Sequence, residues 1–222
     1  MLTAAARKKI TRDWQGRLPQ LGTVGPMLLG RIVGPFVQGI LLDRRSDGKS
    51  YYPSIFVTSL TSSLTVFHMT VNQSLRTTRT HAVDSVSVIS HEQRYGDAVD
   101  RLIAATLLPL NGDWRLRDVI STLLDSRDSG SGLGPRPGLM LELIGACVWG
   151  GAHGVARNLG IGLVDIVQSW PSRQKELHGG EKEWRERVEM TLESADTIHA
   201  YVADQMVRWR MERLPVSRLL ID

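Results

Sequence analysis

The chain has 222 residues and is 42% hydrophobic, which is enough for a buried core in one large domain or two small ones. Its single cysteine, Cys147, excludes an internal disulfide framework and a cysteine-based zinc site, and no stretch reaches the roughly 20 apolar residues of a membrane helix. Residues 1–80 carry eleven Lys and Arg against three Asp and Glu, a balance of +8, although the whole chain balances at only +4, so this half is expected to meet an anionic partner surface.

The N-terminal region begins with a predicted basic helix over residues 4–18, with Trp14 and Leu18 on its apolar side. Residues 20–35 are rich in glycine and proline, which predicts a loop or an irregular entry into a strand. This stretch therefore separates the helix from the first regular strand.

The clearest β signal comes next, as β-rich runs separated by short polar turns. The expected strands are Phe36–Asp43, Tyr51–Leu60 and Leu64–Val71, with turns at Arg44–Lys49 and Thr61–Ser63. The first turn contains Ser-Asp-Gly, a common turn sequence. Together these runs predict an antiparallel meander, to which Val83–Ile89 is a candidate fourth strand.

Helical spacing replaces the β pattern from residue 92 onward. The predicted helices cover 97–108, 114–125, 139–148, 152–159, 163–170 and 181–214. Asp113 is expected to cap the helix that starts at residue 114. The Gly- and Pro-rich segment SGSGLGPRPG, residues 129–138, is the strongest candidate for a linker or flexible loop.

The pattern as a whole predicts an α+β fold, with an N-terminal antiparallel β-meander followed by a C-terminal helical bundle with a long terminal helix. The expected division is a basic α+β region over residues 1–128, a linker or loop over 129–138, and a helical region over 139–222.

The last predicted helix carries an apolar stripe at steps of three or four residues from Trp184 to Trp209. At 1.5 Å per residue, 34 residues would extend about 50 Å, longer than the ~45 Å expected across a compact chain of this size. Either the helix breaks or part of its stripe meets another chain. Trp209 and Arg210, at its end, are therefore predicted partner-binding residues.

A short motif lies within 155–170, where Ala156, Gly160 and Ile166 match the spacing of a helix-turn-helix. The outward side chains of its second helix would be mainly apolar or acidic, which suits neither bases nor phosphates. We expect a buried helical hairpin with a glycine turn, and DNA reading is the alternative.

Two basic clusters lie in the N-terminal half. The predicted partner or nucleic-acid-binding residues there are Arg7, Lys8, Lys9, Arg12, Arg44, Arg45, Lys49 and Tyr51. A tyrosine beside cations suits stacking with single-stranded nucleic acid. Three interpretations remain open for this face: a solvated surface, a contact for an acidic protein, or a contact for nucleic acid.

The titratable residues show no recognised catalytic pattern. His81, Asp84 and His91 form the densest group, which leaves a polar loop, a metal site or an acid–base site open, and no phosphate-loop or nucleophile-elbow motif is present. We predict no cofactor and no metal. The leading hypothesis is a non-catalytic protein-interaction subunit or accessory of a larger cytoplasmic assembly, with a protein partner or a homo-oligomer and no membrane partner. A nucleic-acid-binding protein is the alternative, and an enzyme with a site assembled from distant residues is third.

Overall fold

The computed structural model describes residues 2–62, 69–125 and 137–221. The chain forms two compact units, each built from separate stretches of sequence. Unit 1 comprises Met1–Thr58, Phe67–Asp113 and Met206–Arg218, and unit 2 comprises Ser59–Val66, Trp114–Gln205 and Leu219–Asp222. The predicted linker lies almost wholly in 126–136, outside the described residues, so the domain boundaries drawn around it stay a prediction.

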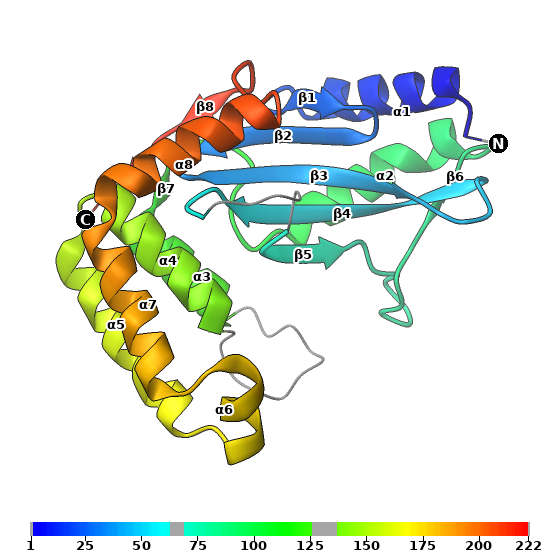
Figure 1. Ribbon diagram of the computed structural model, residues 1–222. Coiled ribbons are helices and arrows are strands. Elements are labelled where there is room, and N and C mark those ends of the chain that lie inside the picture. The colour runs from blue at the N-terminus through cyan, green and yellow to red at the C-terminus, as the bar shows by residue number, and fades with distance from the viewer. Residues whose placement is uncertain (1, 63–68, 126–136, 222) are drawn as a thin grey trace. The chain divides into compact units, whose positions relative to one another are not determined.

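Unit 1 contains the antiparallel sheet (Figure 1). Its strands follow the order β1 (Gly22–Gly25), β2 (Leu28–Val33), β3 (Phe36–Arg44), β4 (Ser50–Ser59) and β5 (Val71–Ser74). Two further strands lie off this path: β6 (Val86–Ser87) pairs antiparallel with β4, and β8 (Val216–Ser217) pairs parallel with β2. The predicted combination of an N-terminal antiparallel sheet and a helical C-terminal region is confirmed.

The predicted meander agrees with the structure at its centre. The strands β3 and β4 match the first two expected runs and are joined by the expected turn. Most of the third expected strand, Leu64–Val71, lies outside the described residues. The described part of that edge is β5, which begins where the prediction ended and pairs from Val57↔Val71 to Ser54↔Ser74. Of the candidate fourth strand, only Val86 and Ser87 pair as β6.

The Gly- and Pro-rich segment predicted as a loop contains β1 and β2. The sheet accommodates these glycines because two of them lie opposite each other in the ladder, Gly30 in β2 and Gly39 in β3. A Cβ on Gly39 would lie 2.6 Å from the Phe56 Cζ, so the absent side chain leaves room for the aromatic ring on the next strand. Gly30, which belongs to the predicted segment, is also closely packed, because a Cβ there would lie 3.3 Å from the Val24 Cγ2, so glycine at this position serves packing within the sheet.

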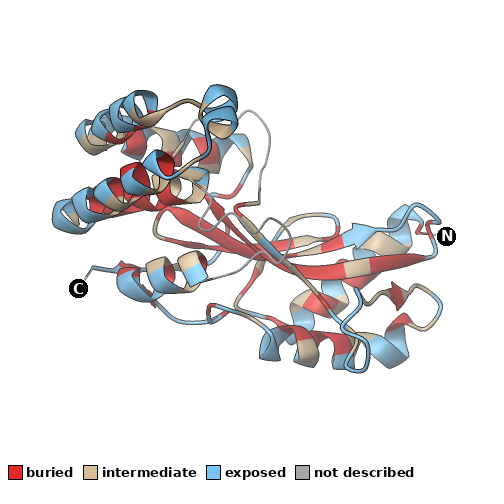
Figure 2. Ribbon diagram, turned by 90° about the horizontal axis from the view of Figure 1, so that it is seen from below, coloured by how far each residue is buried: buried red, intermediate tan, exposed pale blue. Residues whose placement is uncertain are grey.

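Two helices pack against one face of this sheet, α1 (Ala4–Arg17) and α2 (His91–Ala104) (Figure 2). The Thr3 hydroxyl caps α1 by accepting from the Ala6 N–H at 3.2 Å. Their shared core contains Trp14, Leu18, Leu29, Ile40, Tyr51, Val99 and Leu102. The predicted helix of residues 4–18 is confirmed, whereas α2 begins six residues before the predicted residue 97.

A buried arginine holds a loop of unit 1 to the helix-covered face. Arg31, opposite Gln38 in the β2–β3 ladder, is 1% exposed and donates from Nε to the Gln38 side-chain oxygen at 3.0 Å. Its other nitrogens donate to Pro109 O at 2.6 Å, Gly112 O at 2.8 Å and Ser217 Oγ at 3.1 Å. Burial lowers the pKa of Arg31 to about 10, so the group stays charged at neutral pH and needs these acceptors.

The described residues of unit 2 are mainly helical and include a short parallel pair, β7 (Trp114–Arg115) with β9 (Leu219–Leu220). Its helices are α3 (Leu116–Asp125), α4 (Pro137–Trp149), α5 (His153–Gln168), α6 (Ser172–His178), α7 (Glu181–Glu193) and the first eleven residues of α8 (Ala195–Arg208). The chain leaves α4 through Gly151, whose φ of +77° suits glycine, and two bonds close the turn: Gly151 N–H to Val148 O and Ala152 N–H to Cys147 O.

The helix-turn-helix interpretation is wrong, because Ala156, Gly160 and Ile166 all lie within the continuous helix α5. Gly160 is buried, and a Cβ there would come within 2.5 Å of the Val188 Cγ1 on α7. The glycine therefore permits close packing of two helices and does not make a turn.

The single helix expected over residues 181–214 is two helices. The backbone leaves helical geometry at Ser194, whose N–H bonds to Thr191 O and whose carbonyl accepts from the Ile198 N–H, so one residue ends α7 and begins α8. A tight C-terminal cap ends α8: Arg210 has φ +56°, its N–H bonds to Val207 O, and the Met211 N–H bonds to Met206 O. The apolar stripe continues across the break, which is why periodicity alone did not detect it.

Asp113 does not cap α3. Its carboxylate instead accepts from the Arg218 backbone N–H at 2.8 Å and from the Arg218 Nε at 3.0 Å. These bonds lower the pKa of Asp113 and hold the segment after β8 beside the end of the 108–113 loop, within unit 1.

Candidate interaction surface

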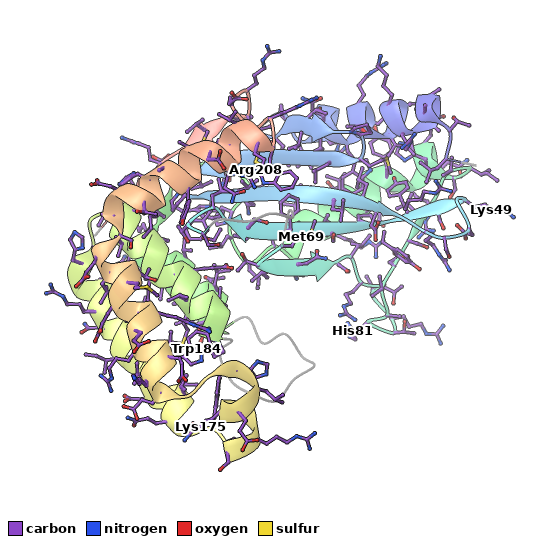
Figure 3. The ribbon with its side chains drawn as sticks, in the orientation of Figure 1. Lys49, Met69, His81, Lys175, Trp184 and Arg208 are labelled. Atoms are coloured by element: carbon purple, nitrogen blue, oxygen red, sulfur yellow. The ribbon has the colours of Figure 1, made fainter. Side chains whose placement is uncertain are left out.

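The structure brings the two basic clusters of the sequence together at one end of unit 1. The Leu2 N–H donates to the Gly48 carbonyl at 2.8 Å, which ties the residue before α1 to the tip of the β3–β4 hairpin. Figure 1 shows the start of α1, this hairpin and β6 at the same end of the sheet, and Figure 3 shows Lys49 at the hairpin. We call the hairpin cations Arg44, Arg45 and Lys49, together with Lys8 on the adjoining helix α1, the basic end.

Local chemistry fixes the hairpin tip. Gly48 has φ +62°, a conformation that glycine adopts without strain, and its N–H donates to Arg45 O at 2.9 Å. The Asp47 carboxylate accepts from the Lys49 backbone N–H at 2.8 Å. This bond, more than the nearby cations, lowers the pKa of Asp47. The tip is therefore a closed turn that holds its basic side chains outward.

The cations differ in how far they are neutralised. Among the described residues, Lys8, Arg12, Arg44 and Lys49 make no ion pair with a carboxylate. The Arg45 Nε lies 3.9 Å from the Asp47 carboxylate, and its guanidinium lies 5.3 Å from the centre of the Tyr52 ring.

Two of the α1 cations predicted to bind a partner are not fully available at the surface, because one is paired with carboxylates and the other is half-buried. The Lys9 Nζ is 2.7 Å from the Asp13 carboxylate and 3.1 Å from the Glu92 carboxylate. Arg7 is half-buried, and its Nε is buried with no hydrogen-bond partner in the described part of the chain.

Tyr51, predicted to stack with bases, is fully buried. Its hydroxyl accepts from the Trp14 Nε1–H at 3.1 Å and lies 2.8 Å from the His91 Nδ1. Burial raises its pKa, so it stays protonated and donates to the imidazole. The surface ring beside the hairpin cations is that of its neighbour, Tyr52.

His91 completes a buried polar chain from β4 to α1. Its Nε2 lies 3.0 Å from the Asp13 carboxylate, and Tyr95 stacks on its ring at 4.8 Å between centroids. One neutral tautomer satisfies both contacts, with Nε2–H donating to Asp13 and Nδ1 accepting from Tyr51. Burial lowers the pKa of His91, although the hydrogen bond to Asp13 opposes the shift. The chain joins α1, α2 and β4 directly behind the basic end.

An exposed isoleucine, which the sequence reasoning did not single out, lies beside the hairpin. The Val88 N–H donates to Lys49 O at 2.8 Å, and the next residue, Ile89, is 95% exposed. In the sequence it is the last residue of a candidate strand, where an apolar residue is ordinary and gives no reason to expect exposure. The only sequence feature that could have indicated its exposure was its position directly before Ser90, the N-cap residue of α2.

Trp209 and Arg210 lie beyond the end of α8, and not along the continuous helix that motivated their choice. Trp209 is half-buried, and Arg210 is exposed in the left-handed conformation of the helix cap. Their role in partner binding stays a prediction.

The densest titratable group of the sequence does not converge in space. His81 is exposed in the loop between β5 and β6 (Figure 3), Asp84 is held by Arg101 at 2.7 Å, and His91 is enclosed by the buried polar chain. Within residues 2–62, 69–125 and 137–221, no three His, Cys, Asp or Glu side chains are grouped to hold a metal ion. Burial raises the pKa of Cys147 to about 12, so this thiol is not an activated nucleophile.

No protein-family model, no curated protein and no solved structure matches this chain. Over the described residues, none of the helices combines the length and the apolar character needed to cross a membrane.

Proposed function

We propose that the chain is a non-catalytic interaction subunit or accessory of a larger cytoplasmic assembly, and that it binds an acidic protein through the basic end. The observation that carries this proposal is the joining of α1 to the hairpin by the bond from Leu2 N–H to Gly48 O. It brings the start of α1, the helix that carries Lys8, to the hairpin that carries Arg44, Arg45 and Lys49, and three of these four cations lack an internal carboxylate partner among the described residues. Such a surface attracts carboxylates and increases the rate of association with an acidic partner.

The buried polar chain supports a structural role for the groups behind this surface. Trp14, Tyr51, His91 and Asp13 satisfy one another's hydrogen-bonding groups, and the tyrosine hydroxyl is enclosed. These groups hold α1, α2 and β4 in register, and a substrate would have to break their bonds to react with them. The surface is therefore the better candidate for activity than the buried chain.

Nucleic-acid binding is the second candidate, because Tyr52 lies beside the hairpin cations. An aromatic ring next to unpaired cations suits single-stranded nucleic acid. The Arg45 guanidinium already lies over the ring, so it would have to move before a base could stack there. This competition favours the acidic-protein proposal.

The test is the size of the complex formed by the full chain purified from its native host. Light scattering, with and without nuclease, is compared for the natural chain and for a variant carrying Arg44→Ser, Arg45→Ser and Lys49→Ser. We expect a particle much heavier than the 24.7 kDa chain that survives nuclease and is lost in the variant. These side chains are exposed, so the variant should keep its fold, which circular dichroism checks.

Two results would contradict the proposal. A chain that elutes as a monomer in both forms has no stable partner at this surface. A particle that nuclease removes supports the second candidate, and its affinity for single-stranded DNA should then fall steeply with salt, because each neutralised phosphate releases a counterion.

A further inference from the structure

We propose that Ile89 is the apolar anchor of the basic end, and that the partner offers an apolar pocket rimmed by Asp and Glu side chains. This inference rests on the proposed function and adds which residue anchors the contact and what chemistry the partner presents. It follows from three observations: the exposure of Ile89, the rigidity of the backbone around it, and the charge of its neighbours.

Ile89 is the most exposed of the large apolar side chains in the described part of the chain, at 95%. Nearby residues point the other way: Val88, directly before it, packs against the core of unit 1, and His91, two residues after it, is buried. The chain thus presents one branched apolar side chain to solvent between two inward-facing residues. A single exposed apolar residue is common on a protein surface, so the case for Ile89 depends on the backbone that holds it and on the cations beside it.

The backbone that carries Ile89 is held on both sides. Before it, β6 pairs with the start of β4 at Ser50↔Ser87 and Tyr51↔Val86, and Val88 bonds to Lys49 O. After it, α2 begins at His91, whose ring is bonded to Tyr51 and Asp13. A backbone held in one position loses little conformational entropy on binding, so it presents its side chain to a preformed pocket at low cost.

The charge around Ile89 determines which partner fits. Lys49 lies directly beside it through the Val88 bond, and the rest of the hairpin brings Arg44 and Arg45. Two acids of these segments are already engaged: Glu92 with Lys9 at 3.1 Å, and Asp47 within its own turn. A pocket that receives Ile89 therefore meets cations at its rim, and carboxylates at that rim complement them.

A folded protein fits this combination better than the two other anionic surfaces. A nucleic acid would pair with the cations but offers no aliphatic pocket for a branched side chain. A bilayer rewards the insertion of several apolar groups together with cations, whereas this surface presents one isoleucine. Of these three partners, an acidic protein with an apolar pocket is the one that would contact both the isoleucine and the cations.

The experiment sorts a display library of small folded domains with randomised surface pockets on the immobilised full chain, in its natural form and as Ile89→Ser. Ile161→Ser is the matched control, because Ile161 is also an exposed isoleucine, at 63%, but belongs to unit 2. We expect domains whose randomised positions are enriched in both acidic and large apolar residues on the natural chain and on the control. On Ile89→Ser the acidic enrichment should remain and the apolar enrichment should disappear.

The affinities of the best domains selected on the natural chain should then fall about tenfold for Ile89→Ser and stay within about twofold for Ile161→Ser, as expected for the loss of one buried aliphatic contact. Thermal melting should be equal in all three proteins, because neither side chain is part of the core.

The outcomes separate the anchor from the function on which it rests. Equal apolar enrichment on Ile89→Ser overturns the anchor and leaves the acidic-partner proposal standing. Absence of acidic enrichment on the natural chain overturns both. Oligo(dT), or vesicles containing phosphatidylglycerol, bound more tightly than any selected domain and in a manner sensitive to Ile89→Ser, would assign the anchor to nucleic acid or to a membrane surface and overturn the protein pocket.

Discussion

At the scale of single residues, the main finding is that the aromatic residue chosen for the surface is part of the core. Tyr51 and Tyr52 are adjacent and chemically identical, but strand geometry directs successive side chains to opposite faces of the sheet. Tyr51 joins Trp14 and His91 beneath α1 and α2, whereas Tyr52 lies under Arg45. Sequence alone shows that the two tyrosines must differ in environment and does not show which one is buried.

The two tyrosines provide a paired test of this assignment. Tyr51→Phe removes the acceptor of the Trp14 indole and the donor to the His91 ring, so two buried polar groups lose their partners. We expect a loss of about 1–3 kcal/mol in the free energy of unfolding, measured by urea denaturation. The matched Tyr52→Phe variant should change it by less than about 0.5 kcal/mol. Equal effects in the two variants would contradict the buried network.

The same network predicts how stability depends on pH. The pKa of His91 is lowered by burial from its ordinary 6.5, so the unfolded chain takes up the proton first as the pH falls. The contribution of neutral His91 is therefore complete above pH 6.5 and is lost as the pH falls through the folded-state pKa. The carboxyls whose pKa is lowered by ion pairs or hydrogen bonds, such as Asp13 and Asp84, act only at lower pH, below about 4.

Denaturation of the natural chain at pH 7.5, 6.5 and 5.5 should show this decline. The His91→Gln variant removes the titrating group, so its stability should vary much less over the same range. If both proteins lose stability in parallel between pH 6.5 and 5.5, another group is responsible.

At the scale of elements, periodicity and turn chemistry predicted type better than extent. The β3–β4 hairpin was recognised because its turn depends on neighbouring residues, with Asp47 bonding to the Lys49 backbone and Gly48 at positive φ. A break in the helix predicted over 181–214 was one of the two alternatives, but its position was not predicted, because the apolar stripe of residues 184–209 keeps its phase through Ser194. Local apolar periodicity shows which face of a helix is buried, but it shows poorly where one helix ends and the next begins.

Two glycines of α5 test how helix packing uses missing side chains. A Cβ at Gly160 would come within 2.5 Å of Val188 on α7, whereas at Gly162 the nearest atom would be the Met140 Cε at 3.9 Å. We expect Gly160→Ala to destabilise the protein by about 1–3 kcal/mol through overpacking. Gly162→Ala should instead stabilise it by about 0.5–1 kcal/mol, because alanine is the better helix former. Thermal melts of both variants measure the difference, and the same sign for both would refute the close approach of α5 and α7.

At the scale of the whole molecule, the chain does not complete one unit before it begins the other. Its last segment contributes β8 to unit 1, beside β2, and then β9 to unit 2, beside β7. Between them, Arg218 is bonded to Asp113. Each unit therefore depends on residues near the end of the sequence for part of its backbone hydrogen bonding.

Removal of residues 216–222 should consequently loosen both units. The Gly34 amide, which donates to Ser217 O in unit 1, and the amides of β7 in unit 2 should exchange with solvent faster, as measured by hydrogen exchange. The Leu75 amide, bonded to Pro53 O in the same sheet as Gly34, is an internal control that should keep most of its protection. Faster exchange at Gly34 alone would show that β9 contributes nothing to unit 2.

The sequence was sufficient for the α+β class, the central β3–β4 hairpin, α1 and the basic character of the N-terminal half, because each follows from composition or from interactions between residues close along the chain. It was not sufficient for features that depend on which faces meet. The hydrogen bonds from Leu2 to Gly48 and between Tyr51 and His91 form only after distant segments of the chain have packed. The same is true of the close approach of Val188 to Gly160 and of the position of Ile89 beside Lys49. Packing gives each of these residues its role, because the same glycine, tyrosine or isoleucine can be a turn, a surface ring or a core residue in another arrangement.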